Sequence, residues 1–297
     1  MTKIAKWLWP SLLFCAAAFA QSGTFTSYTT TWANQPRQYG VYVPPSVASH
    51  PSIVLYLHGT YEGPATPWQA ITQWKAMANA NKYIVVWPLA TYQARIQAWY
   101  WDAYNMGFSF ETDPDDAGFV CNLIPALVTQ FSGNPKAVFV TGMSSGAMMT
   151  QRVGMTCPEK IAAIAPVSGQ IYMKQMADPF LPPLPVSSIS VLEIHGDADA
   201  VLQYCGARPH SQWSIDFMTL PSVDQDMKYW QHANACLPPD VRLCTDGSPT
   251  PNVYGLTSTG CRDGVEVRFI DNPGGGHVWP SWAHETISQF FATHEKQ

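Results

Sequence analysis

Residues 137–150 read AVFVTGMSSGAMMT, and this stretch decides the fold. Ala137 to Thr141 are apolar or β-branched with no polar face, which predicts a short, fully buried strand. The Ala and Met residues after Gly146 favour a helix. Between strand and helix lies G-x-S-x-G, in which glycines two residues either side of Ser144 let the two elements pass closely. We therefore expect a strained turn that exposes the Ser144 hydroxyl at a helix N-terminus.

This G-x-S-x-G pattern also occurs in glycine-rich turns that carry no chemistry, so the rest of the chain has to distinguish a nucleophile from such a turn.

The first 20 residues are typical of a secretory signal: two lysines precede an apolar stretch, and Ala18-Phe19-Ala20 fits small-residue cleavage. A membrane anchor is disfavoured because Pro10 interrupts the apolar stretch, which is short for a bilayer. We expect residues 1–20 to be removed, and residues 21–297 to form one exported catalytic domain, extracellular or periplasmic.

The charge balance excludes two classes of partner. The formal net charge is −5, and removal of Lys3 and Lys6 with the signal lowers it to −7. A negative chain with few basic clusters is not expected to bind nucleic acid or an anionic membrane. After the signal, the sequence contains no further apolar run that predicts a membrane span. The sequence leaves the oligomeric state open.

The mature chain keeps an even number of cysteines. They are Cys121, Cys157, Cys205, Cys236, Cys244 and Cys261. In an exported chain, six cysteines predict up to three disulfides, but the sequence does not choose among the 15 possible connectivities. Zinc is the competing interpretation, and it is disfavoured because no C-x-x-C occurs and no histidine lies at finger spacing. We expect neither a metal nor a cofactor.

Apolar runs and helical patterns alternate along the mature chain. Strands are predicted at 37–43, 52–58, 83–87, 137–141, 161–167, 187–195 and 264–270. Helices are predicted to begin near Thr66-Pro67, Asp113 to Asp116, Gly146 and Ser222, and a last one holds Ile287 to Phe291. Three irregular segments interrupt the pattern: an aromatic one at 91–113, a proline-rich loop at 179–185 and a cysteine-bearing insertion at 236–261. The alternation predicts an α/β fold, a doubly wound, mostly parallel sheet with helices on both faces.

A serine nucleophile needs a base within hydrogen-bond reach and a carboxylate that orients the base. On such a sheet the three follow in the order Ser, acid, His, each past the end of a strand. His277 fits best, because it follows a predicted strand and glycines 274–276 allow the chain to turn back toward Ser144. Asp197 and Asp199 both follow the strand at 187–195; we prefer Asp199 as the acid and expect Asp197 to cap the turn.

The oxyanion needs two backbone N–H donors. One is expected from Ser145, directly after the nucleophile, and the other from the loop after the strand at 52–58. In that loop Gly59 permits close approach, and either Thr60 or Tyr61 offers the donor; His58 is expected only to brace the loop.

Several motifs together resemble a known family. They are His58-Gly59, Asp115-Asp116-x-x-Phe119, Gly142-Met-Ser-Ser-Gly146 with Met148-Met149, Ile164 to Gly169, His195-Gly-x-x-Asp199 and Gly275-Gly-His277-x-Trp279-Pro280. In this order they resemble the polyhydroxybutyrate depolymerase and feruloyl esterase group of α/β-hydrolases. The resemblance implies an α/β-hydrolase fold with Ser144 as nucleophile, Asp199 as acid and His277 as base. It also implies that Cys236 pairs with Cys261. The chain departs from the group at Thr60-Tyr61, where relatives are richer in glycine, and at Ala98, where many carry cysteine.

Aromatic residues near the predicted site suggest where substrate binds. Trp99 and Trp101 point to one side if their segment is extended, and Tyr61 and Trp279 lie beside the oxyanion loop and His277. Such rings bind sugars, phenolic acids or apolar polyesters alike. The alternative is that they pack the loop onto the sheet.

The resemblance implies a secreted serine esterase that acts on a polymer-linked ester through an acyl-enzyme. Feruloyl or acetyl esters of plant cell-wall polysaccharide are favoured, because depolymerases of the group often carry a linker and adsorption domain into which this sequence does not continue. An extracellular poly(3-hydroxybutyrate) depolymerase is the alternative, and a serine peptidase is disfavoured because the sequence has no added gating domain. A non-catalytic binding module on the same fold is the remote alternative, because all three triad types occur in order.

Overall fold

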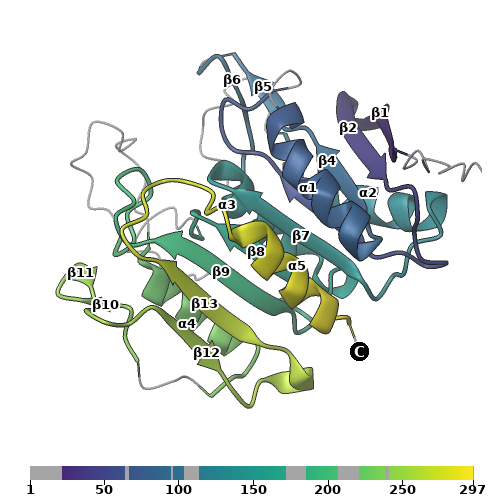
Figure 1. Ribbon diagram of the computed structural model, residues 1–297. Helices are drawn as coiled ribbons and strands as arrows, with labels where there is room; N and C mark the ends of the chain where they lie inside the picture. Colours follow the sequence, from purple (N-terminus) through teal and green to yellow (C-terminus); the bar gives the residue numbers. More distant parts are fainter. Residues whose placement is uncertain are drawn as a thin grey trace, which may run out of the picture.

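The computed structural model describes residues 22–63, 67–94, 96–103, 114–171, 185–206, 221–237 and 241–296, with the backbone alone at 67–70. One large twisted sheet runs through these residues, in the strand order β1-β2-β4-β3-β7-β8-β9-β13-β12 (Figure 1). The six strands from β4 to β13 in this order run parallel, whereas β1, β2 and β12 are antiparallel additions at the two edges. The predicted doubly wound, mostly parallel sheet is confirmed.

The elements follow one another in alternation. The strands of the main sheet are β1 Thr24–Trp32, β2 Gln35–Val43, β3 Ile53–Leu57, β4 Ile84–Pro88, β7 Val138–Met143, β8 Ala163–Val167, β9 Ser190–Gly196, β12 Gly255–Ser258 and β13 Val267–Asn272. The α-helices are α1 Pro67–Asn81, α2 Asp116–Gln130, α3 Ser145–Thr156, α4 Val223–Ala233 and α5 Ala283–Thr293. Short pairs are β5 Thr91–Gln93 with β6 Ala98–Tyr100, and β10 Cys244–Thr245 with β11 Ser248–Pro249; single 3-10 turns are η1 Pro158–Lys160 and η2 Arg262–Gly264.

The central strands are buried because helices cover both faces of the sheet. On one face α1 and α5 bury a cluster that includes Trp74 and Phe291, with Phe291 stacked on Phe139 of β7. On the other face α2, α3 and α4 bury a larger cluster around Leu127 and Trp230. Figure 1 shows α1 and α5 on the near side of the sheet. Continuous apolar strands such as β3 need this double cover, which explains why they contain no polar face.

Two edge strands were not predicted from the sequence. β1 lies in the Ser/Thr-rich segment, where most side chains are exposed, and β12 lies inside the insertion at 236–261. β1 carries no apolar alternation and β12 has only four residues, so their sequences do not distinguish them from loops. The aromatic segment is likewise more regular than expected, because β5 and β6 pair as a short hairpin; residues 104–113 lie outside the described part.

All six cysteines of the predicted mature chain pair. The disulfides are Cys121–Cys157, Cys205–Cys244 and Cys236–Cys261, so the pairing that the resemblance implied is confirmed. The predicted signal, residues 1–20, lies outside the described residues, as does most of the proline-rich loop. Over the described ranges, no helix combines the length and apolarity that crossing a bilayer requires.

Candidate active site

Ser144 lies in a strained turn between β7 and α3. Its backbone has φ 56° and ψ −121°, a combination that is rare for a residue with a side chain. The two motif glycines permit the turn: a Cβ on Gly142 would lie 2.5 Å from the Leu57 carbonyl oxygen, and a Cβ on Gly146 would collide with the carbonyl oxygens of Leu57 and His58. Close contact with β3 therefore requires glycine at both positions, as the sequence predicted.

The turn sets Ser144 at the beginning of α3, beside the loop that follows β3. Thr60 Oγ1 donates a hydrogen bond of 3.0 Å to Ser145 Oγ, which joins this loop to the first residue of the helix. Tyr61 N–H donates to the Trp99 carbonyl oxygen at 3.2 Å, so this donor is already used. Of the two donors that the sequence left open, Thr60 N–H is the one with no protein acceptor in the described part of the chain.

His277 and Asp199 meet at the carboxyl ends of β13 and β9. His277 Nδ1 lies 2.8 Å from Asp199 Oδ2, and the carboxylate is fully buried while the imidazole keeps 17% of its surface exposed. Asp199 Oδ1 accepts the N–H groups of Val201 and Leu202, both at 2.8 Å. Both carboxylate oxygens of Asp199 thus have hydrogen-bond partners, which hold the carboxylate in one orientation.

A second histidine, His195, also approaches this carboxylate. Its Nε2 lies 2.8 Å from the Leu202 carbonyl oxygen and 3.3 Å from Asp199 Oδ2. Burial raises the pKa of Asp199, but the hydrogen bonds from His195 and His277 outweigh it, so the pKa lies well below the usual range for a carboxyl. Asp199 therefore stays ionised beside His277. The sequence placed His195 at the strand end but did not indicate this role.

Asp197 has a different contact, which separates the two candidate acids. Its Oδ1 accepts the Gly274 N–H at 2.6 Å, and Ala198 N–H donates to the Gly275 carbonyl oxygen at 3.0 Å. Asp197 therefore fastens the glycine run before His277 to the acid loop. Its carboxylate bonds to a residue 77 positions away in the chain, whereas the sequence predicted that it would cap its own turn. Gly196 allows this approach, because a Cβ there would collide with the Gly275 carbonyl oxygen.

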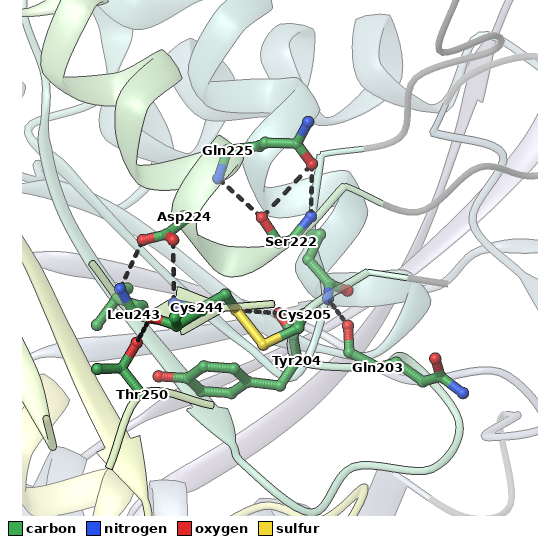
Figure 2. Close-up of a disulfide and its surroundings, with 11 residues drawn as sticks. Gln203, Tyr204, Cys205, Ser222, Asp224, Gln225, Leu243, Cys244 and Thr250 are labelled. Carbon is green, nitrogen blue, oxygen red and sulfur yellow. Dashed lines mark hydrogen bonds between the residues drawn. A yellow bond between two sulfur atoms is a disulfide. The ribbon is translucent and has the colours of Figure 1, made fainter. Parts of the chain in front are cut away.

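The loop after Asp199 is anchored by a disulfide. Figure 2 shows Cys205 bonded to Cys244, next to Tyr204 and the start of α4. Asp224 of α4 accepts the N–H groups of Leu243 at 2.7 Å and Cys244 at 3.0 Å, which fixes the far side of the bridge (Figure 2). The Tyr204 ring packs edge-on against Phe269 of β13 and His195 of β9. Disulfide and ring together tie the acid loop to the sheet.

The serine and histidine loops come together through residues at the end of β8. Ser144 N–H donates to the Val167 carbonyl oxygen at 3.1 Å, and Ser168 Oγ donates to the Val278 carbonyl oxygen at 3.4 Å. Over the described residues, no hydrogen bond links Ser144 Oγ to His277. Such a contact commonly shortens only when substrate is bound.

His58 braces the loop after β3, as the sequence predicted. Its Nε2 accepts the Ala90 N–H at 3.1 Å, and its Nδ1 lies 2.7 Å from the Gly59 carbonyl oxygen. Burial lowers the pKa of His58 to about 4, with the hydrogen bond to Gly59 opposing the shift, so the ring is neutral near pH 7. A neutral ring with Nε2 as acceptor and Nδ1–H as donor satisfies both contacts.

The predicted aromatic platform needs a correction at Trp101. This ring has no exposed surface and packs 5.3 Å from the His58 ring, so it belongs to the core and offers no face to substrate. Trp101 therefore fits the alternative given above, in which the ring packs its loop onto the sheet. Trp99 is half-buried, edge-on to Tyr92, and Tyr61 is 68% exposed.

Trp279 is also partly committed to packing. Its ring contacts Tyr56, Trp74 and His284, and its Nε1 donates to His284 Nδ1 at 2.9 Å. This packing fixes the chain two residues after His277.

A buried ion pair holds the aromatic segment and was not predicted. Arg37 of β2 lies 2.6 Å from Asp116 at the start of α2, and Asp116 Oδ2 also accepts the Asp102 N–H at 3.0 Å. Arg37 lies over the Phe119 ring, 4.0 Å from its centroid. The motif Asp115-Asp116-x-x-Phe119 thus fixes the chain next to Trp101, at some distance in sequence from the triad candidates.

These geometries agree with what comparison with known proteins finds. A family model described as Phospholipase/Carboxylesterase, of the α/β-hydrolases, matches residues 40–235, well over half of the chain. The chain belongs to this family. The matched residues include the turn at Ser144 and the acid loop at Asp199, whereas β13 and His277 lie beyond them.

Among curated relatives of this phospholipase/carboxylesterase-family chain, acetylxylan esterase A of Talaromyces purpureogenus is 31% identical over 129 residues, 43% of this chain and 32% of the relative. A probable acetylxylan esterase A of Aspergillus niger is 29% identical over 157 residues, 52% of this chain and 50% of the relative. The matched regions thus span between about a third and a half of these relatives.

Solved structures share the fold at lower identity. An acetyl xylan esterase from Aspergillus awamori superposes with a TM-score of 0.61 at 19% identity, over 90% of this chain and 99% of that one. A feruloyl esterase module from Clostridium thermocellum, complexed with sinapinate, gives 0.56 at 15% identity, over 92% and 88%. Both confirm the α/β-hydrolase fold. The predicted polyhydroxybutyrate depolymerase and feruloyl esterase grouping is not specifically confirmed; the family shown is the phospholipase/carboxylesterase one.

Proposed function

We propose that this chain is a secreted serine carboxylic ester hydrolase that removes acetyl or feruloyl groups from plant cell-wall polysaccharide. The observation that carries the proposal is the contact of 2.8 Å between His277 and the buried Asp199 carboxylate, at the same edge of the sheet as the strained Ser144 turn. A buried, ionised carboxylate hydrogen-bonded to a partly exposed imidazole is the arrangement that a general base requires.

In this proposal Ser144 Oγ attacks the ester carbonyl carbon while His277 Nε2 takes the hydroxyl proton. Asp199 holds Nδ1–H and so keeps Nε2 free to accept. The tetrahedral intermediate expels the sugar oxygen, which receives the proton from His277, and an acyl-Ser144 remains. Water then attacks the acyl carbon and gives a proton to His277. The second tetrahedral intermediate breaks its bond to Ser144 Oγ, which receives that proton from His277, and the carboxylic acid leaves.

The negative charge on the carbonyl oxygen would be held by the N–H groups of Ser145 and Thr60. Ser145 N–H belongs to the first turn of α3, whose positive dipole end favours an anion. Thr60 N–H is supported by the bond from its side chain to Ser145 Oγ.

The choice of substrate rests on the relatives. Acetylxylan esterases are among the curated proteins that the chain matches, and a feruloyl esterase module is among its structural neighbours. Tyr61 is exposed and bonds through its N–H to the Trp99 carbonyl oxygen, so the loop after β3 offers aromatic surface for a sugar or phenolic ring. The signal-like N-terminus and three disulfides support export to an oxidising compartment.

The test compares three substrates with the purified mature protein and Ser144→Ala. Acetate release from acetylated xylan and ferulate release from methyl ferulate are measured beside clearing of a poly(3-hydroxybutyrate) film. We expect acetate or ferulate release that Ser144→Ala abolishes, with the film untouched. Clearing of the film alone would replace the substrate class with polyester, and full activity in Ser144→Ala would overturn the mechanism.

A further inference from the structure

Ser168 is a buried polar residue at the edge of the sheet where the triad candidates lie. It directly follows β8, which lies between β7 and β9 in the sheet (Figure 1), and only 1% of its surface is exposed. Neither the triad nor the two oxyanion donors uses its hydroxyl group. A buried hydroxyl group at this place is expected to have a hydrogen-bond partner, and the identity of that partner indicates what Ser168 does.

The backbone around Ser168 is fixed to the nucleophile turn on one side and to β9 on the other. The carbonyl oxygen of the preceding residue, Val167, accepts the Ser144 N–H at 3.1 Å. Ser168 N–H itself donates to the Ile194 carbonyl oxygen of β9 at 2.8 Å. Gly169 lets the chain pass close to α3, because a Cβ there would lie 2.5 Å from the Ser144 carbonyl oxygen. Both chain neighbours of Ser168 are therefore in contact with the backbone of Ser144.

The Ser168 side chain bonds to the loop that carries His277. Its Oγ donates to the Val278 carbonyl oxygen at 3.4 Å, one residue after the imidazole. Val278 N–H donates to the Gly276 carbonyl oxygen at 2.9 Å, so His277 is the central residue of a three-residue turn. The hydroxyl group of Ser168 thus holds the turn from which the His277 side chain projects.

Ser168 keeps this contact in a backbone conformation that favours glycine. Its φ is 51°, which is uncommon for a residue with a Cβ. Glycine would adopt this conformation without strain but would supply no hydroxyl group. Such strain persists only where the surrounding structure holds it, and here the bonds to Ile194 and Val278 do so.

We propose that Ser168 is a positioning residue, whose hydroxyl group holds the His277 loop at the correct distance from Ser144. The inference rests on the proposed function, since it assigns a role within that site. Ser168 acts through the backbone: its main chain is fixed beside the nucleophile turn, and its side chain fixes the loop of the base.

This role predicts that the effect of losing the hydroxyl group depends on the leaving group of the ester. An alkoxide leaving group needs a proton from His277, whereas p-nitrophenolate is stable enough to leave without one. A displaced His277 should therefore impair hydrolysis of an alkyl ester more than hydrolysis of a p-nitrophenyl ester. A smaller fraction of folded protein would lower both rates by the same factor.

The test compares Ser168→Ala and Ser168→Gly with Ser190→Ala, each assayed for kcat/KM on ethyl acetate and on p-nitrophenyl acetate, which share one acyl group. Ser190 is a matched control: it is a buried serine at the start of β9, and its Oγ accepts the Glu266 N–H at 3.2 Å. Ser168→Gly removes the hydroxyl group and also relieves the positive φ, so it serves if Ser168→Ala does not fold. Thermal unfolding of each variant reports the loss of stability.

We expect Ser168→Ala and Ser168→Gly to lower kcat/KM on ethyl acetate at least about 10-fold, and on p-nitrophenyl acetate by a smaller factor. Ser190→Ala should leave the ratio of the two values unchanged. An unchanged ratio in the Ser168 variants, or the same change of ratio in Ser190→Ala, would overturn the inference. Ser144→Ala is assayed alongside on both esters, and its activity decides the proposed function separately.

Discussion

His277 Nδ1 lies 2.8 Å from Asp199 Oδ2, and the carboxylate that it contacts is shared with His195 at 3.3 Å. His195 of β9 thus helps to fix Asp199. The same carboxylate orients His277 in the loop after β13. The arrangement gives the carboxylate a structural partner and a functional one, and their contributions can be separated by mutation.

Replacing Asp199 with asparagine should lower kcat by about 10³–10⁴-fold, because the amide can present N–H to His277 and favour the wrong tautomer. Val201 and Leu202 N–H groups still find an oxygen, so the fold should survive. Steady-state kinetics measure kcat, and circular dichroism tests whether the variant is folded. The paired control is Asp197→Asn, which should lose far less activity; a larger loss there would make Asp197 the acid.

The buried His58 predicts an acid-sensitive fold. The unfolded chain takes up a proton near the ordinary pKa of about 6.5, whereas folded His58 does so only near pH 4. Between these values the unfolded state binds more protons, so the unfolding free energy falls as pH falls, by about 3 kcal/mol in total.

Urea unfolding from pH 7 to pH 4 measures this term. His58→Gln, in which the amide oxygen can accept the Ala90 N–H, should flatten the dependence. The matched control is His50→Gln at an exposed histidine. Identical slopes for the two variants would contradict a neutral, buried His58.

A methyl group at Gly146 should disrupt the turn at Ser144. The added Cβ would collide with two carbonyl oxygens of the β3 end, so Gly146→Ala should cost about 1–3 kcal/mol and displace the nucleophile. Chemical denaturation and kcat measure the two effects. Gly276→Ala, where a Cβ meets nothing within 4 Å, is the control for stability. Equal stability of the two variants would argue against close contact between β3 and α3.

Two disulfides of similar span separate stability from activity. Cys205–Cys244 closes a separation of 39 residues and Cys121–Cys157 one of 36, so removal of either by serine substitution should cost about 3–4 kcal/mol. Only the first anchors the loop that carries Asp199, so its loss should also lower kcat about 10-fold. The kcat values of the two variants are compared at a temperature where both are folded. Equal values would show that the loop carrying Asp199 keeps its position without the Cys205–Cys244 disulfide.

The sequence was sufficient for the parts of the molecule in which local pattern and packing agree. Strands such as β3 and β7 are apolar because helices cover both faces. The G-x-S-x-G glycines mark the turn in sequence, and the close approach of the β3 end requires them there. The chain order of serine, acid and histidine placed Asp199 and His277 at neighbouring strand ends, where the structure also has them.

Other features depend on contacts that no local pattern encodes. Trp101 and Trp99 look equivalent in sequence, yet Trp101 is buried because it packs on His58, 43 residues earlier in the chain. The role of His195 depends on how the loop after β9 folds back, since its Nε2 lies 2.8 Å from the Leu202 carbonyl oxygen. The polar edge strand β1 exists because β2 pairs with it, which its own composition does not show.

The most direct test of the central claim is the site of covalent labelling by a fluorophosphonate, which traps an activated serine. Intact-mass and peptide analysis of the purified mature chain should show one adduct, on the peptide that contains Ser144. It should be absent in Ser144→Ala and strongly slowed in His277→Ala. An adduct on another residue, or labelling and ester hydrolysis that persist in Ser144→Ala, would contradict the account.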